Sequence, residues 1–341
     1  MNPIMNPIMD PFINPQRGRG PNPTALESFD RCAVQAGLRG DPMLGTAFPA
    51  PRLLLVEQPG PWGRAGLMDS RFERAAARRL VAVLDPRGVR VVAIRRPGRA
   101  APDGRRRWAL ADCRAGRERL RWGRFDVDAE LLEVAMAAME DRGTGELPAR
   151  GAETVDQEPL FAVCAHGTHD VCCAVRGRPV AAALERIRPG RVWECSHVGG
   201  DRFAANVLVL PTGVLYGRVE AEDGPALVDA AEHGVVLADH LRGRVGFAPE
   251  VQAAMAHAVR EVPTVRLSDI TLVRVRRLST SRLVIRLRWP GEVVDVDVST
   301  AQSAPQWLTC HSVQPSGATI YRPMSLRRVR ATPLGSPAEF E

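Results

Sequence analysis

The sequence contains no lysine, and all 46 of its basic residues are arginine, with a formal net charge of +7. A surface that binds a phosphate backbone usually combines arginine with lysine. The arginine-rich stretches, residues 95–107 and 114–124, also lack a series of interleaved aromatic side chains on which bases could stack, since Trp122 is the only aromatic residue in them. We therefore expect these stretches to form solvated strand edges and loops, and we do not expect a nucleic-acid partner.

Long apolar runs are absent as well. No stretch approaches the roughly 20 apolar residues that cross a bilayer, and the N-terminal residues lack the basic and apolar regions of a signal peptide. The hydrophobic content of 45% is that of an ordinary globular protein. We expect a cytoplasmic protein that does not bind membranes.

A Cys-x-x-Cys pair is also missing, which argues against a zinc ribbon and against a dithiol oxidoreductase. The chain has seven cysteines, and an odd number in a cytosolic protein argues against a disulfide framework. Four of the seven lie between residues 164 and 195, and this clustering indicates a chemical role. The other three, Cys32, Cys113 and Cys310, are isolated in the sequence, and we expect them to be buried structural thiols.

The chain divides into segments of different composition. Proline recurs every few residues at the start, which disfavours both helix and sheet, and alternating apolar and charged residues near the end predict half-buried strands with arginine and aspartate facing solvent. We predict the following organisation: a disordered arm (1–27), an α/β domain (28–147), a linker (148–159), a thioredoxin-like domain (160–245), a β-rich region forming a small appendage (246–332) and a tail (333–341).

The thioredoxin-like prediction rests on the order of elements. Apolar runs and turn signals predict, in order, a buried strand (160–167), a helix (176–187), a second strand (192–197), a hairpin (206–219) and a closing helix (224–241). Pro179 is placed in the first turn of the first helix, where its missing N–H costs little. The order strand, helix, three strands, helix is typical of an α/β, thioredoxin-like fold.

Two loops in this domain carry cysteine and histidine. The first reads CAHGTHDVCC from Cys164 to Cys173, and the second reads CSHVGGD from Cys195 to Asp201. Thiolates combined with imidazole, in loops at neighbouring strand ends, suit a zinc ion or an iron–sulfur cluster.

The sequence resembles the sucrase/ferredoxin-like family. The resemblance is carried by both loops, by HVGGDRFAANVLVLPTGVLYGRV (197–219) and by GTAFPAPRLLLVEQPGPWG (45–63), and it covers roughly residues 28–245. It implies a thioredoxin-like ferredoxin domain with a [2Fe–2S] cluster and a redox partner protein. No pair of carboxylates in a sugar-cleaving arrangement supports the sucrase part of the family name.

The resemblance also implies a ligand set. Cys164 and Cys173 match the two thiolate ligands of the family and His197 matches its first histidine, whereas Asp201 stands where a second histidine is expected. Cys195 offers a softer ligand for iron than a carboxylate does.

Cys172 is a further candidate for the fourth position, beside Asp201 and Cys195. Around the ligands, Gly199 and Gly200 free backbone N–H groups that can point at sulfur, and Arg202 could offset negative charge. With one histidine instead of two, we expect a reduction potential below that of a centre held by two cysteines and two histidines.

These residues favour one-electron transfer or redox sensing over substrate turnover. One alternative is a zinc-stabilised or metal-free thioredoxin-like module with a structural or interaction role. A second alternative is a thiol-dependent enzyme, with Cys172 or Cys173 as nucleophile and His166 or His169 as base. We expect both of these histidines to bind the backbone instead, as loop histidines commonly do.

Overall fold

A computed structural model describes residues 30–99, 104–140, 152–262 and 266–329 of the chain. The predicted disordered arm and the predicted tail lie outside the described residues, as does part of the predicted linker. No helix in the described ranges is long and apolar enough to cross a membrane.

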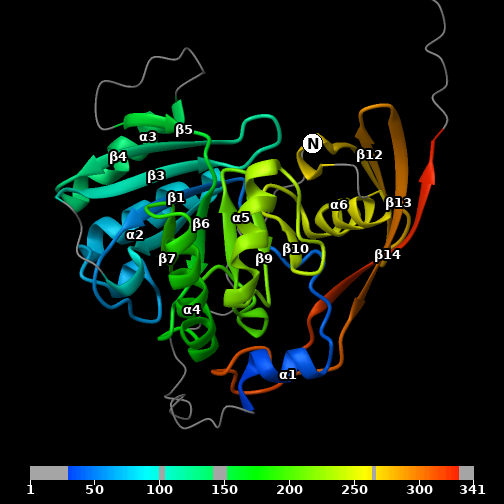
Figure 1. The fold of residues 1–341 in the computed structure, drawn as a ribbon, viewed down its shortest axis with the longest axis horizontal. Helices are drawn as coiled ribbons and strands as arrows, with labels where there is room; N and C mark the ends of the chain where they lie inside the picture. Colours follow the sequence, from blue (N-terminus) through cyan, green and yellow to red (C-terminus); the bar gives the residue numbers. More distant parts are fainter. Residues whose placement is uncertain (1–29, 100–103, 141–151, 263–265, 330–341) are drawn as a thin grey trace, which may run out of the picture.

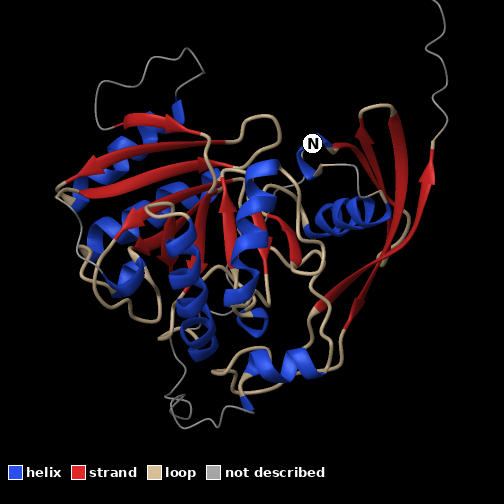
Figure 2. Ribbon diagram, viewed as in Figure 1, coloured by secondary structure: helices blue, strands red, loops and turns tan. Residues whose placement is uncertain are grey.

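The structure consists of two β-sheets and the helices that cover them (Figures 1 and 2). The α-helices are α1 (Cys32–Leu38), α2 (Arg74–Leu84), α3 (Leu131–Glu140), α4 (Val171–Ile187), α5 (Gly224–His233) and α6 (Pro249–Glu261). The strands of the large sheet are β1 (Arg52–Glu57), β2 (Val89–Arg95), β3 (Arg106–Asp112), β4 (Arg119–Phe125), β5 (Ala152–Asp156), β6 (Leu160–Cys164), β7 (Val192–Cys195), β8 (Val207–Leu210), β9 (Val214–Tyr216) and β10 (Leu241–Arg244). The strands of the small sheet are β11 (Thr271–Arg277), β12 (Arg282–Trp289), β13 (Glu292–Gln302) and β14 (Thr319–Arg328).

The large sheet has ten strands in the order β10-β9-β8-β6-β7-β2-β1-β3-β4-β5. Within it, β6 and β7 are parallel, while β8 and β9 are antiparallel to their neighbours. The order β7-β6-β8-β9, with α4 between β6 and β7 and α5 after β9, is that of a thioredoxin-like fold. The α/β fold class and the predicted hairpin are therefore confirmed.

The sheet is continuous from the first half of the chain to the second. Strand β2 pairs with β7 in antiparallel fashion, through Ile94 with Cys195 and Arg95 with Glu194. Strand β5, within the range predicted as a linker, pairs with β4. The domain boundaries therefore remain a prediction, placed on a sheet that crosses them.

Side chains on alternate positions of the strands separate the core into two faces. In β6, Phe161 and Val163 pack with residues of α4, α5 and α6, whereas Leu160, Ala162 and Cys164 face a second core shared with α1 and with the inner side of β1. This alternation follows from the two-residue period of a strand. It directs Cys164, the last residue of β6, into the interior.

Helix α4 begins earlier than the sequence predicts. It starts at Val171, with Asp170 as N-cap accepting a hydrogen bond from the backbone N–H of Cys172 (2.9 Å), so Pro179 lies inside the helix and not in its first turn. The prediction gave too much weight to proline as a start signal and too little to an aspartate cap. The earlier start places Cys172 and Cys173 in the first helical turn.

The C-terminal region forms the small antiparallel sheet, as predicted, with one addition. Helix α6 packs on it, and its apolar residues share a core with β12 and β13. The arginine and aspartate side chains predicted to face solvent form cross-strand ion pairs, Arg286 with Asp295 and Arg282 with Asp297, in which Asp295 is buried and not exposed. The long connection between β13 and β14 (303–318) leaves this sheet and runs alongside α1 (Figure 1).

Candidate metal centre

The two loops with cysteine and histidine emerge at the same edge of the large sheet. Strands β6 and β7 are parallel and in register, with Cys164 opposite Cys195, so the segments that follow them start side by side. The first segment leads into α4 and the second leads through Gly199 and Gly200 to a 3₁₀ turn at Asp201–Phe203. The sequence prediction that these loops adjoin is confirmed.

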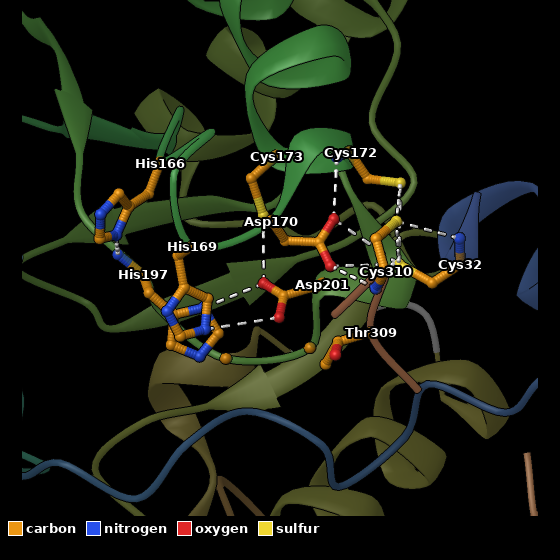
Figure 3. Close-up of polar contacts among 12 residues, drawn as sticks. Cys32, His166, His169, Asp170, Cys172, Cys173, His197, Asp201, Thr309 and Cys310 are labelled. Atoms are coloured by element: carbon orange, nitrogen blue, oxygen red, sulfur yellow. Dashed lines mark hydrogen bonds and ion pairs between the residues drawn. The ribbon is translucent and has the colours of Figure 1, made fainter. Parts of the chain in front are cut away.

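Four side chains converge between these loops: Cys164, Cys173, His197 and Asp201. The Cys173 thiol donates to Asp201 Oδ1 over 3.2 Å, and the thiols of Cys164 and Cys173 are near enough to shift each other's pKa. His197 Nδ1 lies 3.0 Å from the same Asp201 oxygen (Figure 3). Asp201 therefore contacts one thiol and one imidazole, and the second thiol lies beside the first.

The charges of this group are arranged in pairs. Burial alone would raise the pKa of Asp201, but His197 outweighs burial and lowers that pKa below its ordinary value. Burial lowers the pKa of His197, and Asp201 more than reverses this, so the pKa of His197 is raised. The hydrogen bond from Cys173 lowers the pKa of Cys164. The group therefore holds negative charge on Asp201, with Cys164 the more readily ionised thiol.

Cys173 lies in the first turn of α4, a helix of 17 residues, and the positive end of a helix favours a thiolate. The neighbouring Cys164 thiol and burial act in the opposite direction and raise the pKa of Cys173. Of the two thiols, Cys164 is therefore the one that ionises more readily.

One buried atom of the group has no hydrogen-bond partner in the described part of the chain. His197 Nδ1 faces Asp201 Oδ1 without hydrogen-bond alignment. This ion pair forms only when the ring is protonated, and in the neutral ring the nitrogen can be satisfied by a bound ion or ligand. Together with two thiols and a carboxylate, it forms a donor set that fits a thiophilic metal centre.

The second loop is fixed by a buried arginine. Gly199 and Gly200 both have positive φ (77° and 73°), which lets the loop turn tightly after His197. Arg242, 1% exposed, donates to the Gly199 carbonyl (2.8 Å) and to Asn206 Oδ1 (2.7 Å). A Cβ at Gly200 would lie 2.3 Å from Arg242 Nη2, so this position also requires glycine for space.

Arg242 is a functional candidate that the sequence analysis missed. Burial lowers its pKa to about 9, and Asp201, Cys164 and Cys173 act on it electrostatically. The arginine predicted for this role, Arg202, lies farther out and faces Asp41, with Nε 3.6 Å from the carboxylate. Arg242 follows the hairpin by some 25 residues and sits in the short strand β10, so no local motif marks it.

His166 and His169 bind the backbone, as predicted. His166 accepts from the His197 N–H at Nδ1 (3.2 Å), so its Nε2–H donates to the Gly63 carbonyl (2.8 Å). His169 Nδ1 donates to the Arg64 carbonyl (3.3 Å), and burial lowers the pKa of both rings to about 4.

His169 nevertheless lies against the candidate ligands. Its ring stacks on that of His197 with 3.7 Å between the centroids, and its Nε2 is 3.7 Å from Asp201 Oδ2. Because Nδ1 holds the proton, Nε2 is free to bind a metal, and a backbone carbonyl orienting the opposite nitrogen is the usual support of a metal-binding histidine. Three residues with metal-binding atoms therefore adjoin here: His169, His197 and Asp201.

The two other cysteines considered for the fourth position make no side-chain contact with Asp201 or His197 in the described structure. Cys195 lies opposite Cys164 on β7 and is buried in the apolar core. The Cys172 sulfur points away from Cys173 and lies 3.7 Å from that of Cys32 and 3.4 Å from that of Cys310 (Figure 3). Cys32 and Cys113 are buried as predicted, whereas Cys310 is only partly buried. Although Cys32 and Cys310 are isolated in the sequence, the fold brings their sulfurs to 3.6 Å from each other.

Comparison with known sequences places this site within a family. The pattern of the sucrase/ferredoxin-like family matches residues 45–243, which is more than half of the chain. The chain belongs to the sucrase/ferredoxin-like family. The resemblance identified in the sequence is confirmed, and both loops of the candidate centre lie within the matched residues.

One known sequence and one solved structure are similar to parts of this sucrase/ferredoxin-like chain. "Altered inheritance of mitochondria protein 32" of Meyerozyma guilliermondii is 32% identical over 102 residues, which are 27% of this chain and 36% of the relative. The chain thus spans about a third of that relative's length. A thioredoxin-like [2Fe–2S] ferredoxin from Aquifex aeolicus is similar in structure over 27% of this chain and 97% of its own, with 18% identity and a TM-score of 0.24.

Proposed function

We propose that this protein binds a [2Fe–2S] cluster through Cys164, Cys173, His197 and Asp201, and that it carries single electrons or senses redox state. The observation that supports this proposal most directly is the convergence of two thiols, an imidazole and a carboxylate at one edge of the thioredoxin-like sheet. Bound there, such a cluster would accept and return one electron.

The four proposed ligands are held in place by different elements of the fold. Cys164 ends a strand and Cys173 begins a helix, so both sulfurs are held by regular structure. His197 and Asp201 lie on a loop that Arg242 fixes through the Gly199 carbonyl. The positive charge of Arg242 offsets part of the negative charge of the thiolates and Asp201.

The fourth ligand in this proposal is Asp201, with His169 as its competitor. Asp201 is 2% exposed at its side chain and contacts both Cys173 and His197. His169 approaches the same place with a free Nε2. With Asp201 bound, the oxidised centre would carry a net charge of about −1, and with His169 in its place the charge would be about zero.

A redox partner would meet the protein at the two stacked rings. His169 and His197 are 18% and 16% exposed at their side chains, whereas Asp201 is 2% exposed and both cysteines are buried. Electron transfer falls steeply with distance, so the exposed edge of these rings is the place for a partner protein. We include a cytoplasmic location in the proposal, because thiolate ligands persist in a reducing compartment.

The experiment is to purify the full chain without oxygen and to measure iron, sulfide and zinc per chain. We expect about two irons, a red-brown colour with broad visible absorption, and loss of both in Cys164→Ser and Cys173→Ser. Cys113→Ser, another buried cysteine, is the matched control and should keep its iron.

Two outcomes would contradict the proposal, each in favour of a different alternative. A colourless protein without iron would sink the electron-transfer function and favour a structural module. Selective, pH-dependent alkylation of Cys173 in the native protein would instead indicate a thiol enzyme. Comparing His169→Ala with Asp201→Ala assigns the fourth ligand, because loss of the true ligand changes the spectrum of the reduced protein.

A further inference from the structure

A second group of potential ligands lies beside the candidate centre. It consists of Cys32 in α1, Asp170 and Cys172 at the start of α4, and Cys310 in the connection between β13 and β14. Cys32 and Cys310 are 278 residues apart in the chain, and both lie outside the residues that match the family. In Figure 3 the three cysteines of this group lie on one side of Asp170, and His197 and Asp201 lie on the other.

The distances within the group are those of a tetrahedron. The three sulfurs are 3.4, 3.6 and 3.7 Å apart, and the Cys32 sulfur lies 3.6 and 3.8 Å from the two Asp170 oxygens. With Zn–S bonds of about 2.3 Å and a Zn–O bond of about 2.0 Å, tetrahedral geometry gives edges of about 3.8 Å between sulfurs and about 3.5 Å between sulfur and oxygen. The three measured edges between sulfurs and the closer sulfur–oxygen edge therefore leave room for one ion at the centre.

Backbone N–H groups orient these ligands. Asp170 accepts from the N–H of Cys172 (2.9 Å) at one oxygen and from that of Cys310 (2.7 Å) at the other. The N–H of Cys32 donates to the Cys310 sulfur (3.4 Å). Each carboxylate oxygen has a second lone pair, so the hydrogen bonds leave Asp170 able to bind a cation.

Asp170 also lacks a positive partner among the described side chains. It is 0% exposed, and within the described ranges no arginine or histidine side chain forms an ion pair with it. Burial raises the pKa of this carboxyl to about 7, so it is held either as the neutral acid or as a carboxylate beside a cation. A metal ion bound by the three sulfurs would provide that cation.

We propose that Cys32, Asp170, Cys172 and Cys310 form a tetrahedral binding site for one zinc ion. Binding releases the thiol protons to solvent as three Zn–S bonds and one Zn–O bond form, with no change of oxidation state. Sulfurs this close together suit a single ion, because the cysteines of a [4Fe–4S] cluster each bind a different iron and are spread around the cluster. A disulfide would need two of these sulfurs to approach to about 2.05 Å and would leave the third unpaired.

The proposed zinc ion would join three distant parts of the chain. It would hold the N-terminal helix α1 and the connection 303–318 against the first turn of α4, directly beside Cys173. A role as a structural clamp follows, since all four positions of the ion are taken by protein and none is open for a substrate. The inference does not rest on the proposed function, because it uses none of the four residues assigned to the cluster.

The test is to measure zinc and iron per chain in the full-length protein, purified anaerobically under reducing conditions. We expect about one zinc per chain in the wild type, and X-ray absorption at the zinc edge should show three sulfurs and one oxygen ligand. Cys310→Ser and Cys32→Ser should each weaken zinc binding, measured by competition with a chelator, by more than about tenfold. Cys113→Ser is the control and should bind zinc as the wild type does.

Cys310→Ser is the more informative variant, because Cys310 lies in a connection outside both sheets and its replacement leaves their cores intact. Iron content and circular dichroism should be unchanged in it. Zinc that survives both serine substitutions overturns the proposal, as does a wild type without zinc. Loss of iron in place of zinc in Cys310→Ser, or a disulfide among these cysteines in the anaerobic protein, also contradicts it.

The two proposals can fail separately. A protein that contains zinc but no iron would support the zinc site and contradict the electron-transfer function. A protein that contains iron but no zinc would support the electron-transfer function and contradict the zinc site.

Discussion

Asp201 would contribute a negative charge to the proposed centre. It contacts both Cys173 and His197 and is almost fully buried, and by the sequence resemblance it stands where a second histidine is expected. An ionised carboxylate at a cluster stabilises the oxidised state, whereas a neutral imidazole stabilises the reduced state.

Asp201→His should therefore raise the reduction potential of the proposed centre, by on the order of 100 mV, because one negative ligand is replaced by a neutral one. The measurement is a potentiometric titration followed by visible absorption. The matched control is Asp41→Asn, which removes a carboxylate that faces Arg202 and contacts no candidate ligand in the described structure. A potential unchanged in Asp201→His would mean that Asp201 does not bind the centre.

Among individual residues, the sequence predicted only those candidate ligands that are marked by their spacing within a short motif. The nine-residue step from Cys164 to Cys173 and the position of His197 led to the predicted ligand set, and in the structure Cys173 and His197 both contact Asp201. Cys310 could not be placed, because a cysteine that meets its neighbours only through tertiary structure leaves no periodic or spacing signal. Arg242 was missed for the same reason.

Helix α4 is held unusually close to strand β6. A Cβ added at Gly177 would lie 2.1 Å from the carbonyl oxygen of Cys164, which is backbone and cannot move aside as a side chain could. The absence of a side chain at this point lets the helix lie against the end of the strand. The contact fixes the position of Cys164 relative to Cys173.

Gly177→Ala should destabilise the protein by about 1–3 kcal/mol or more, because the helix must shift away from β6. The same shift should reduce iron retention, since the two cysteines lie on the two elements that separate. Denaturant unfolding and iron analysis measure the two effects. Gly37→Ala in α1, where an added Cβ meets no atom within 4 Å, is the control and should be close to neutral; equal effects of the two substitutions would contradict this account.

The elements themselves were predicted unevenly. The strands of the thioredoxin-like part and the hairpin followed from apolar runs and the turn at Pro211–Gly213, whereas helix α6 (Pro249–Glu261) was absorbed into the β-rich region. Eight of its residues are buried, so the polar face by which an amphipathic helix is recognised is narrow, with Glu250, His257 and Glu261 along it.

On the scale of the whole molecule, one sheet joins the two halves of the chain at a narrow seam. Strands β2 and β7 share two residue pairs, and one of them, Arg95 with Glu194, is a buried ion pair of 2.8 Å with side chains 5% and 3% exposed. Arg95 also donates to the Gly60 carbonyl (2.9 Å). This pair anchors the first half of the sheet to the thioredoxin-like half.

Arg95→Met should destabilise the protein by about 3–5 kcal/mol, because it leaves Glu194 buried without its partner. Arg95→Met combined with Glu194→Leu should recover most of that loss. Thermal unfolding followed by circular dichroism is the measurement, and we expect a single cooperative transition in the wild type. Arg176→Met, in a partly exposed pair with Glu220, should cost less than about 1 kcal/mol. Two separate transitions in the wild type would show that the halves unfold independently.

This continuity was beyond the reach of the sequence. The antiparallel pairing of β2 with β7 joins strands about a hundred residues apart, and no local pattern distinguishes a strand at a sheet's centre from one at a domain's edge. Composition indicated a linker at 148–159, but part of that range, β5, pairs with β4.

The first turn of α4 lies between the two proposed centres and contributes one cysteine to each. Adjacent residues of a helix point about 100° apart, and Cys172 and Cys173 use that angle to face Cys310 on one side and Asp201 on the other. Inserting or deleting one residue before this turn would rotate both sulfurs away at once. Both proposed centres therefore constrain the length of the loop from Cys164 to Asp170. A displacement of the helix at one centre also moves the ligand of the other, because Cys172 and Cys173 are joined by one peptide bond.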